Sequence, residues 1–224
     1  MKVYNIQRYV LFEKFPRLYD LIINVFGYKR AVRRFMRRFK SNGVIVDLGC
    51  GSGLLSVCVA KNNRNSSVIA IDKSDGLLKI LRDQLDKEGV KNVEIIRSDL
   101  SQCLPIKNNT LDFVITSGLI EYVDYDDLFK GVYRSLKMNG RFLILAIKNN
   151  VFGRLLGKIF GFRPCNLRDI LDMLYKTGFR RVKLLDFDDL KGLNMIKTCI
   201  VSIKSSFSFQ GRDIDGLISF LCFL

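Results

Sequence analysis

A short apolar run that ends in three closely spaced glycines constrains the fold of this chain more than any other feature. Residues 44–48 read Val-Ile-Val-Asp-Leu, and glycines follow at positions 49, 51 and 53. A brief apolar run that stops at turn residues predicts a strand buried on both faces. Glycine lets the backbone turn sharply and lets a ligand approach without a Cβ in the way. The sequence therefore predicts a buried strand that opens on a binding loop.

Strand and helix patterns alternate after this loop. The helix that starts near Asp75 shows the clearest periodicity, because its leucines recur at three- and four-residue steps. The Asn139-Gly140 pair predicts the turn that ends another helix. We expect strands at 44–48, 67–72, 93–96, 111–116, 141–147, 181–187 and 195–203, and helices at 53–61, from 74 or 75 onward, and at 124–136, 151–160 and 166–176.

Alternating strands and helices predict a parallel sheet covered by helices on both faces. Ligands of such sheets bind beyond the carboxyl ends of the strands. Asp72 ends the second expected strand, Asp99 follows the third, and Ser117-Gly118 follows the fourth. These residues and the glycine loop should therefore meet at one edge of the sheet.

The glycine loop does not match the dinucleotide-binding pattern. That pattern, GxGxxG, requires a glycine at position 54, where this chain has Leu54. Asp47 would give no advantage to a pyrophosphate, but it suits a cofactor with a cationic amino group. Asp72 lies about 20 residues beyond the loop, where a carboxylate can accept both ribose hydroxyls of either kind of cofactor.

Five motifs in order resemble those of a known family. They are VDLGCGSG at 46–53, AIDKS at 70–74, RSDLSQCLP at 97–105, LDFVITSGLIEYV at 111–123 and LKMNGRFLILAI at 136–147. Over roughly residues 17–204 the chain resembles the class I S-adenosylmethionine-dependent methyltransferases of the small-molecule type, which include the ubiquinone/menaquinone methyltransferases. The resemblance implies an α/β three-layer sandwich with a Rossmann-like seven-stranded sheet, in the order 3-2-1-4-5-7-6 with the last strand antiparallel.

The resemblance also implies S-adenosyl-L-methionine as the cofactor and a role for each matching residue. The glycine loop would line the methionine moiety, Asp72 would bind the ribose, and Asp99 would accept from the adenine amino group. The residues after the fourth strand would form the floor near the methyl donor. The expected cofactor-binding residues are Asp47, Gly49, Cys50, Gly51, Gly53, Asp72, Lys73, Asp99, Leu100, Ser117 and Gly118.

The chain has no histidine, so neither a histidine base nor a Ser-His-Asp site can form. Many relatives carry a histidine after the fourth strand, where this chain has Tyr122. Methyl transfer by in-line displacement can depend on positioning alone. If a base is used, Tyr122, Glu121 and the N-terminal tyrosines 4, 9 and 19 are the candidates; alternatively, Tyr122 is only a packed aromatic. The six scattered cysteines have no metal-type spacing, and we expect no metal site.

The positive charge is large and uneven. The net charge is +15, and the first 40 residues hold eleven bases but only two acids. Such a field fits an anionic partner, which could be a membrane surface, a nucleic acid or an acidic substrate. In 29–40, Val32, Phe35, Met36 and Phe39 form an apolar stripe opposite arginines. This helix could lie on an anionic membrane or pack its stripe on the sheet, and we favour packing.

We expect one methyltransferase domain at 43–204, preceded by a basic helical segment at 1–42 and followed by an apolar tail at 205–224. An insertion at about 148–164 would form an apolar lid over the substrate, which favours a small, apolar, aromatic or lipid-like acceptor. No signal peptide or run long enough to span a bilayer is visible, so we expect a cytoplasmic protein, with peripheral membrane contact open. The alternatives are an RNA or protein methyltransferase that uses the basic surface, with RNA less favoured, and a non-catalytic scaffold.

Overall fold

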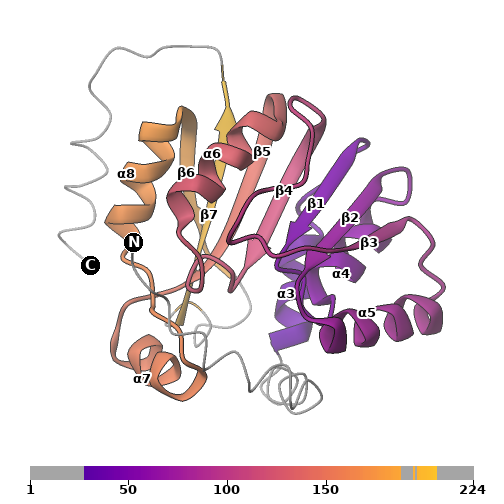
Figure 1. Ribbon diagram of the computed structural model, residues 1–224, viewed down its shortest axis with the longest axis horizontal. Helices are drawn as coiled ribbons and strands as arrows, with labels where there is room; N and C mark the ends of the chain where they lie inside the picture. Colours follow the sequence, from indigo (N-terminus) through magenta and orange to yellow (C-terminus); the bar gives the residue numbers. More distant parts are fainter. Residues whose placement is uncertain (1–27, 188–193, 195, 206–224) are drawn as a thin grey trace.

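The computed structural model describes residues 28–187, 194 and 196–205, and these form a seven-stranded sheet with helices on both faces (Figure 1). The strands lie in the order β3-β2-β1-β4-β5-β7-β6. The strands are β1 (Val44–Leu48), β2 (Ser67–Asp72), β3 (Val93–Arg97), β4 (Leu111–Ser117), β5 (Leu136–Ile147), β6 (Phe179–Leu185) and β7 (Lys197–Lys204). The helices are α3 (Tyr28–Met36), α4 (Leu54–Asn62), α5 (Asp75–Glu88), α6 (Tyr125–Ser135), α7 (Val151–Phe160) and α8 (Leu167–Thr177).

The sheet topology confirms the expected fold class. Neighbouring strands from β3 through β5 pair in parallel, whereas β7 runs antiparallel to both β5 and β6. The order reverses between β1 and β4. The strands β2 and β3 are added on one side of β1, and the chain then returns to the other side of β1 to add β4 and β5. This reversal is the switch point at which sheets of this kind bind ligands.

The strand residues point alternately to two cores. In β5, Phe142 and Ile144 face the core shared with α6 and α8, whereas Leu143 and Leu145 face the core shared with α3 and α4. All four side chains are fully buried. A strand buried on both faces needs an unbroken apolar run, and residues 142–147 in the second half of β5 provide one. Figure 1 shows α6 and α8 beside β5 to β7, and α3, α4 and α5 beside β1 to β3.

The basic helix α3 packs its apolar stripe against the sheet. Val32 and Met36 are fully buried, and Phe35 and Phe39 are 4% and 6% exposed. The ring of Phe39 stacks on Phe113 of β4, with 5.7 Å between the ring centroids. Arg30 and Arg37 remain exposed. The stripe therefore belongs to the core, as the packing interpretation predicts, and it is not available to a membrane.

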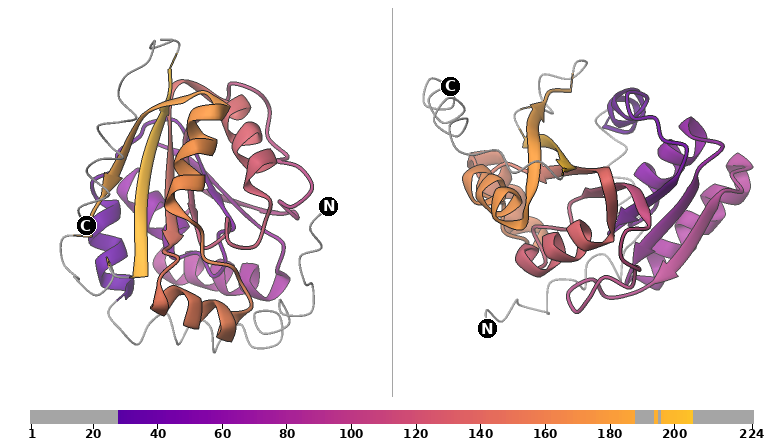
Figure 2. Two further views of the ribbon diagram at one scale, coloured as in Figure 1. Left: turned by 90° about the vertical axis from the view of Figure 1, so that its left-hand side faces the viewer. Right: turned by 90° about the horizontal axis from the view of Figure 1, so that it is seen from above.

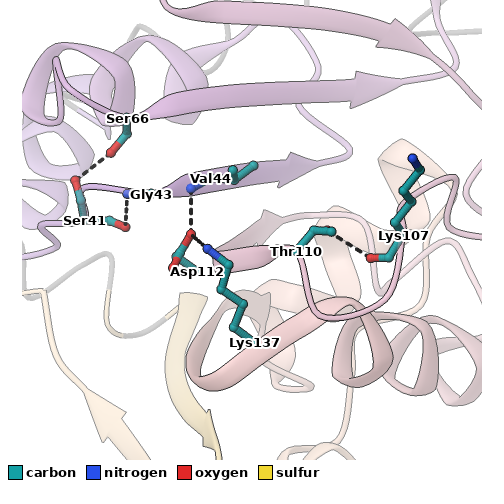
Figure 3. A network of polar contacts seen from close by, with 8 residues as sticks. All are labelled: Ser41, Gly43, Val44, Ser66, Lys107, Thr110, Asp112 and Lys137. Carbon is teal, nitrogen blue, oxygen red and sulfur yellow. Dashed lines mark hydrogen bonds and ion pairs between the residues drawn. The ribbon is translucent and has the colours of Figure 1, made fainter.

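A polar contact fixes the start of β1 (Figure 3). Asp112 of β4 accepts from the backbone N–H of Val44 at 2.8 Å and from Lys137 Nζ at 2.8 Å. A Cβ at Gly43 would collide with this carboxylate, so the close approach requires glycine there. The contact joins β1, β4 and β5 at the edge opposite the binding loop.

Several strand boundaries differ from those that the sequence predicts, and two of the differences have a clear cause in the register of the sheet. β5 begins at Leu136 and not at Arg141, because Asn139 and Gly140 form an irregularity within the strand and not a turn before it. Asn139 adopts the left-handed region, at φ 63°. β6 begins at Phe179 and not at Arg181, since Arg181 (φ 51°) lies in a second register shift between Arg180 and Lys183. A bulge of this kind leaves no distinct signal in the apolar pattern.

The segment after β5 forms α7, which lies apart from both helical layers. Figure 1 and the left view of Figure 2 show it at the lower end of the molecule. The helix α5, which directly follows β2, also lies at this lower end. The carboxyl ends of the parallel strands therefore point toward the lower end of the molecule in Figure 1. Within the described ranges, none of the helices combines the length and the apolar character needed to cross a membrane. Residues 1–27 of the expected N-terminal segment and residues 206–224 of the expected tail lie outside the described residues.

Candidate functional site

A cavity opens at the carboxyl ends of β1, β2, β3 and β4, at the switch point of the sheet. Its walls come from four loops that follow different strands. The lining residues are Gly49, Gly51, Asp72, Lys73, Ser74, Leu77, Ser98, Asp99, Leu100, Ser101, Ser117, Gly118, Leu119, Tyr122 and Val123.

The glycine loop is a tight turn held against the end of β2. The N–H groups of Gly49 and Cys50 both donate to the carbonyl of Ile71, at 2.9 and 3.0 Å. Gly49, Gly51 and Gly53 all have positive φ, at 67°, 54° and 91°. A Cβ at Gly51 would have no atom nearer than 4.0 Å, so the turn leaves open space on the cavity side of this residue. At Gly53, in contrast, a Cβ would collide with Leu81 of α5.

Asp72 connects the glycine loop to the start of α5. Its Oδ2 accepts from the N–H of Gly51 at 2.9 Å, and its Oδ1 accepts from the N–H of Ser74 at 2.9 Å. Burial raises the pKa of this carboxyl above its ordinary value, although the backbone donors act in the opposite direction. Two carboxylate oxygens offer about four acceptor positions, so acceptor capacity remains for a ligand in the cavity.

Asp47 lies beneath the loop and not on the cavity wall. It is 1% exposed, and its Oδ2 accepts from Ser56 Oγ at 2.5 Å. Among the described residues, nothing donates to its buried Oδ1. Burial, with a smaller contribution from the neighbouring Asp72 carboxylate, raises the pKa of Asp47 to about 7 against the opposing effect of the Ser56 hydrogen bond. An unpaired acceptor inside a protein is costly, so a donor or a cation brought close by a ligand would relieve that cost.

The wall opposite the glycine loop carries an ion pair. Lys73, directly after β2, lies 4.0 Å from the Asp99 carboxylate. Asp99 Oδ1 also accepts from the N–H of Ser101 at 3.0 Å. Ser98 belongs to the same wall, and its N–H donates to the carbonyl of Asp72. This end of the cavity is therefore rich in hydrogen-bonding groups.

The floor of the cavity follows β4 and is mostly apolar. It contains Leu119, Tyr122 and Val123 beside Ser117 and Gly118. The ring of Tyr122 meets that of Phe162 edge-on, at 5.7 Å between centroids. Lys197 of β7 donates from Nζ to Ser117 Oγ at 2.8 Å.

Glu121 turns away from this floor. Its Oε1 accepts from the N–H of Ile147 at 2.6 Å, at the end of β5, and the residue is 3% exposed. Its Oε2 is buried without a donor from the described residues, and burial raises the pKa of the carboxyl. The structure therefore places Glu121 outside the cavity lining and Tyr122 inside it.

The structure brings most of the sequence-predicted site residues together. Gly49, Gly51, Asp72, Lys73, Asp99, Leu100, Ser117, Gly118 and Tyr122 line one cavity. Four others support the cavity from outside its lining: Asp47, Cys50, Gly53 and Glu121. The three N-terminal tyrosines proposed as bases lie outside the described residues.

The sequence analysis assigns no role to some residues that line the cavity. Ser74, Ser98, Ser101 and Val123 lie within the quoted motifs, and Leu77 lies three positions beyond one of them. Treating every position of each motif as a candidate would have included all of these except Leu77. Lys197 is different, because 80 positions separate it from Ser117 and no local pattern connects the two.

Part of the chain matches a family model. Residues 45–140 match the model described as a methyltransferase domain. A demethylmenaquinone methyltransferase of Listeria welshimeri is 30% identical over 139 residues, which are 58% of each chain. A ubiquinone/menaquinone biosynthesis C-methyltransferase of Pasteurella multocida is 32% identical over 162 residues, 66% of this chain and 58% of the relative. The chain thus spans less than two thirds of the length of these relatives.

Solved structures share the fold at low identity. Phosphoethanolamine N-methyltransferase 2 of Haemonchus contortus, in complex with S-adenosyl-L-methionine, has a TM-score of 0.71 and 17% identity, over 89% of this chain and 60% of the other. Geranyl diphosphate C-methyltransferase of Streptomyces coelicolor has a TM-score of 0.65 and 14% identity, over 81% and 86%. The chain therefore has a methyltransferase-type Rossmann-like fold and resembles the ubiquinone/menaquinone group of class I methyltransferases.

Proposed function

We propose that this chain binds S-adenosyl-L-methionine in the cavity at the switch point and transfers its methyl group to a small apolar or aromatic acceptor. The observation that carries the proposal is the hydrogen bond between the glycine loop and the Asp72 carboxylate. One carboxylate holds the turn at Gly51 and still faces the same cavity. The match to the methyltransferase domain model supports the same conclusion.

The residues present fit this cofactor. Asp72 would accept the ribose hydroxyls, and Asp99 with Leu100 would hold the adenine at the polar wall. The glycine turn would receive the methionine moiety, where a Cβ would occupy the space beside Gly51. Asp47 lies beneath this turn with a buried, unpaired oxygen, so it would attract the cationic amino group through the loop. When bound, the cofactor supplies an electrophilic methyl group on a sulfonium.

The chain's own contribution to the reaction would be positioning. Ser117, Gly118 and Leu119 would place the acceptor at the cavity floor, and Tyr122 with Phe162 would cover it with aromatic surface. Displacement at a methyl group gains most from holding the reacting atoms close and in line. Tyr122 lines the cavity and is the better placed candidate if a proton must be removed, since Glu121 is occupied by the N–H of Ile147.

The character of the floor supports an apolar or aromatic acceptor over a nucleic acid. Leu119, Val123 and Tyr122 form this wall. Among the described residues, the basic ones at the cavity are Lys73, at the opposite wall, and Lys197, which lies outside the lining and bonds to Ser117 of the floor. The named relatives act in quinone biosynthesis, which supports an aromatic ring as the acceptor. An RNA or protein acceptor would instead require basic or extended surface next to the methyl group.

Label transfer tests the proposal. The full chain is incubated with S-adenosyl-L-methionine that carries a labelled methyl group and with a reduced demethylated quinone, and the products are partitioned. We expect the label in the organic phase. Label in the aqueous phase, from RNA or protein added to a parallel reaction, would overturn the choice of acceptor.

The Asp72→Ala variant is the control for the site. We expect it to weaken cofactor binding by about 1–3 kcal/mol, because the ribose hydroxyls lose a charged acceptor. Isothermal titration with the product S-adenosylhomocysteine measures the loss. Unchanged affinity would contradict the assigned role of Asp72, and no binding by the unaltered protein would favour a non-catalytic scaffold.

A further inference from the structure

The helix α7 turns its apolar face away from the protein. Among the described residues, large hydrophobic side chains that are exposed gather on this helix. Val151 is 69% exposed, Phe152 50%, Leu155 56% and Ile159 59%. The sequence predicts an apolar lid over the substrate; Leu156 and Phe160 of the same helix are half-buried, whereas these four side chains face outward.

Two glycines explain this orientation. Gly153 and Gly157 are buried and form the inward side of α7. A Cβ at Gly153 would collide with the carbonyl of Lys148, and a Cβ at Gly157 would lie 2.7 Å from the carbonyl of Phe162. Asn150 caps the helix by accepting from the N–H of Gly153 at 2.9 Å. The backbone is therefore packed too closely for the helix to roll over and bury its large side chains.

The charged residues of α7 and of the sequence on either side of it are all basic. No Asp or Glu occurs between Leu128 and Arg168. Arg154 and Lys158 of α7 are exposed, as is Arg163 just beyond its end. A helix with exposed large apolar side chains and flanking bases matches the surface of a bilayer that contains anionic lipids.

We propose that α7 docks the protein on an anionic lipid bilayer, with Phe152, Leu155 and Ile159 inserted between the headgroups and Arg154 and Lys158 against lipid phosphates. A second copy of the chain is a poorer partner. A two-fold contact through this face would bring the bases of both copies together with no acid on the helix to offset them.

The docking helix is connected to the cavity. Phe162, which follows α7, packs against the ring of Tyr122 in the cavity floor. The N–H of Arg163 donates to the carbonyl of Glu121 at 3.4 Å. A bilayer at α7 would therefore lie beside the acceptor end of the cavity and would deliver a lipid-dissolved acceptor there. This last consequence rests on the proposed function, whereas the docking does not.

Flotation with lipid vesicles tests the docking. The full chain is mixed with vesicles of phosphatidylcholine alone or with one third phosphatidylglycerol, without any cofactor. We expect the chain to float with the anionic vesicles and to be released at high salt. The Leu155→Ser/Ile159→Ser variant should bind about tenfold or more weakly, because two inserted side chains are lost.

The matched control is Met138→Ser/Leu184→Ser, which removes two exposed hydrophobic side chains elsewhere on the surface (48% and 38% exposed). It should float as the unaltered chain does. Equal flotation of the two double variants, or no binding by the unaltered chain, would overturn the proposal. A dimer in the absence of lipid that the α7 substitutions dissociate would overturn it in favour of a second copy.

S-adenosylhomocysteine titration of the same variants separates the two proposals. Both double variants should bind the ligand with unchanged affinity, since neither pair lines the cavity. Vesicle binding without cofactor binding would leave the docking surface in place and contradict the proposed function. Cofactor binding without vesicle binding would overturn the docking surface and leave the proposed function in place.

Discussion

At the scale of single residues, two glycines with similar backbone angles carry different roles. Gly51 (φ 54°) lines the cavity, whereas Gly89 (φ 63°) ends α5 at a position where a Cβ would have no other atom within 4 Å. Alanine at either position must adopt the left-handed region, which costs about 1–2 kcal/mol. We expect Gly51→Ala and Gly89→Ala to lower the free energy of unfolding by similar amounts, as measured by urea denaturation.

Only Gly51→Ala should also weaken cofactor binding, because its methyl group would enter the space beside the loop. Titration with S-adenosylhomocysteine distinguishes the two variants, and Gly89→Ala serves as the control for strain. Equal affinities in the two variants would show that the cofactor does not approach the loop at Gly51.

The buried carboxyl of Asp47 predicts a pH dependence. Its pKa in the folded chain is raised to about 7, chiefly by burial, above the ordinary 3.8 that it regains on unfolding. The folded state therefore binds the proton more tightly, and this residue's contribution to stability falls as the pH rises from about 4 to 7. The expected slope is on the order of 1 kcal/mol per pH unit.

Asp47→Asn removes the titration and keeps an acceptor for Ser56. The variant should gain stability relative to the unaltered chain between pH 4 and 7, and the difference should level off above pH 7. Urea denaturation across this range measures it. A difference that stays constant with pH would mean that Asp47 does not titrate in the folded protein.

At the scale of elements, α3 shows that a basic amphipathic helix can belong to the core. Phe35 packs against Phe187, with 4.5 Å between ring centroids, while Arg30 on the same helix is exposed. We expect Phe35→Ala to lower the free energy of unfolding by about 3–5 kcal/mol, the usual cost of removing a buried aromatic ring.

Arg30→Gln is the matched change on the opposite face and should alter the same free energy by less than about 0.5 kcal/mol. Chemical denaturation of both full-length variants provides the comparison. A loss below about 1 kcal/mol for Phe35→Ala would show that α3 adds little to the stability of the sheet.

At the scale of the whole molecule, the two amphipathic helices α3 and α7 differ in what covers their apolar faces. The stripe of α3 is buried against the sheet, whereas the apolar face of α7 is exposed at the lower end in Figure 1. The cavity opens at that same end, beyond the carboxyl ends of the strands. Surface chemistry suited to a membrane therefore lies next to the site where an acceptor would react.

Apolar patterning in the sequence was sufficient for the strands and for the centre of the cavity, and the family resemblance implied the order of the strands. Strands such as β1 and β4 are short apolar runs between turn residues, and such runs are readable because both faces are buried. The sequence also predicts the turn at Gly49 and Gly51 and the role of Asp72, for a similar reason. Backbone geometry and ligand chemistry restrict those positions to particular residue types.

The tertiary structure decided what depends on contacts between distant segments. Local periodicity shows that α7 has an apolar side, but only the close packing of Gly153 and Gly157 determines that this side faces outward. Likewise, Glu121 and Tyr122 are neighbours in sequence, and the N–H of Ile147 turns Glu121 away from the cavity. The contact of Lys197 with Ser117 exists because β7 lies beside β5. The family resemblance implies that pairing, but no local pattern predicts which side chains it brings together. Direction and partnership are properties of the packed chain, since a side chain's environment is set by whichever segments fold against it.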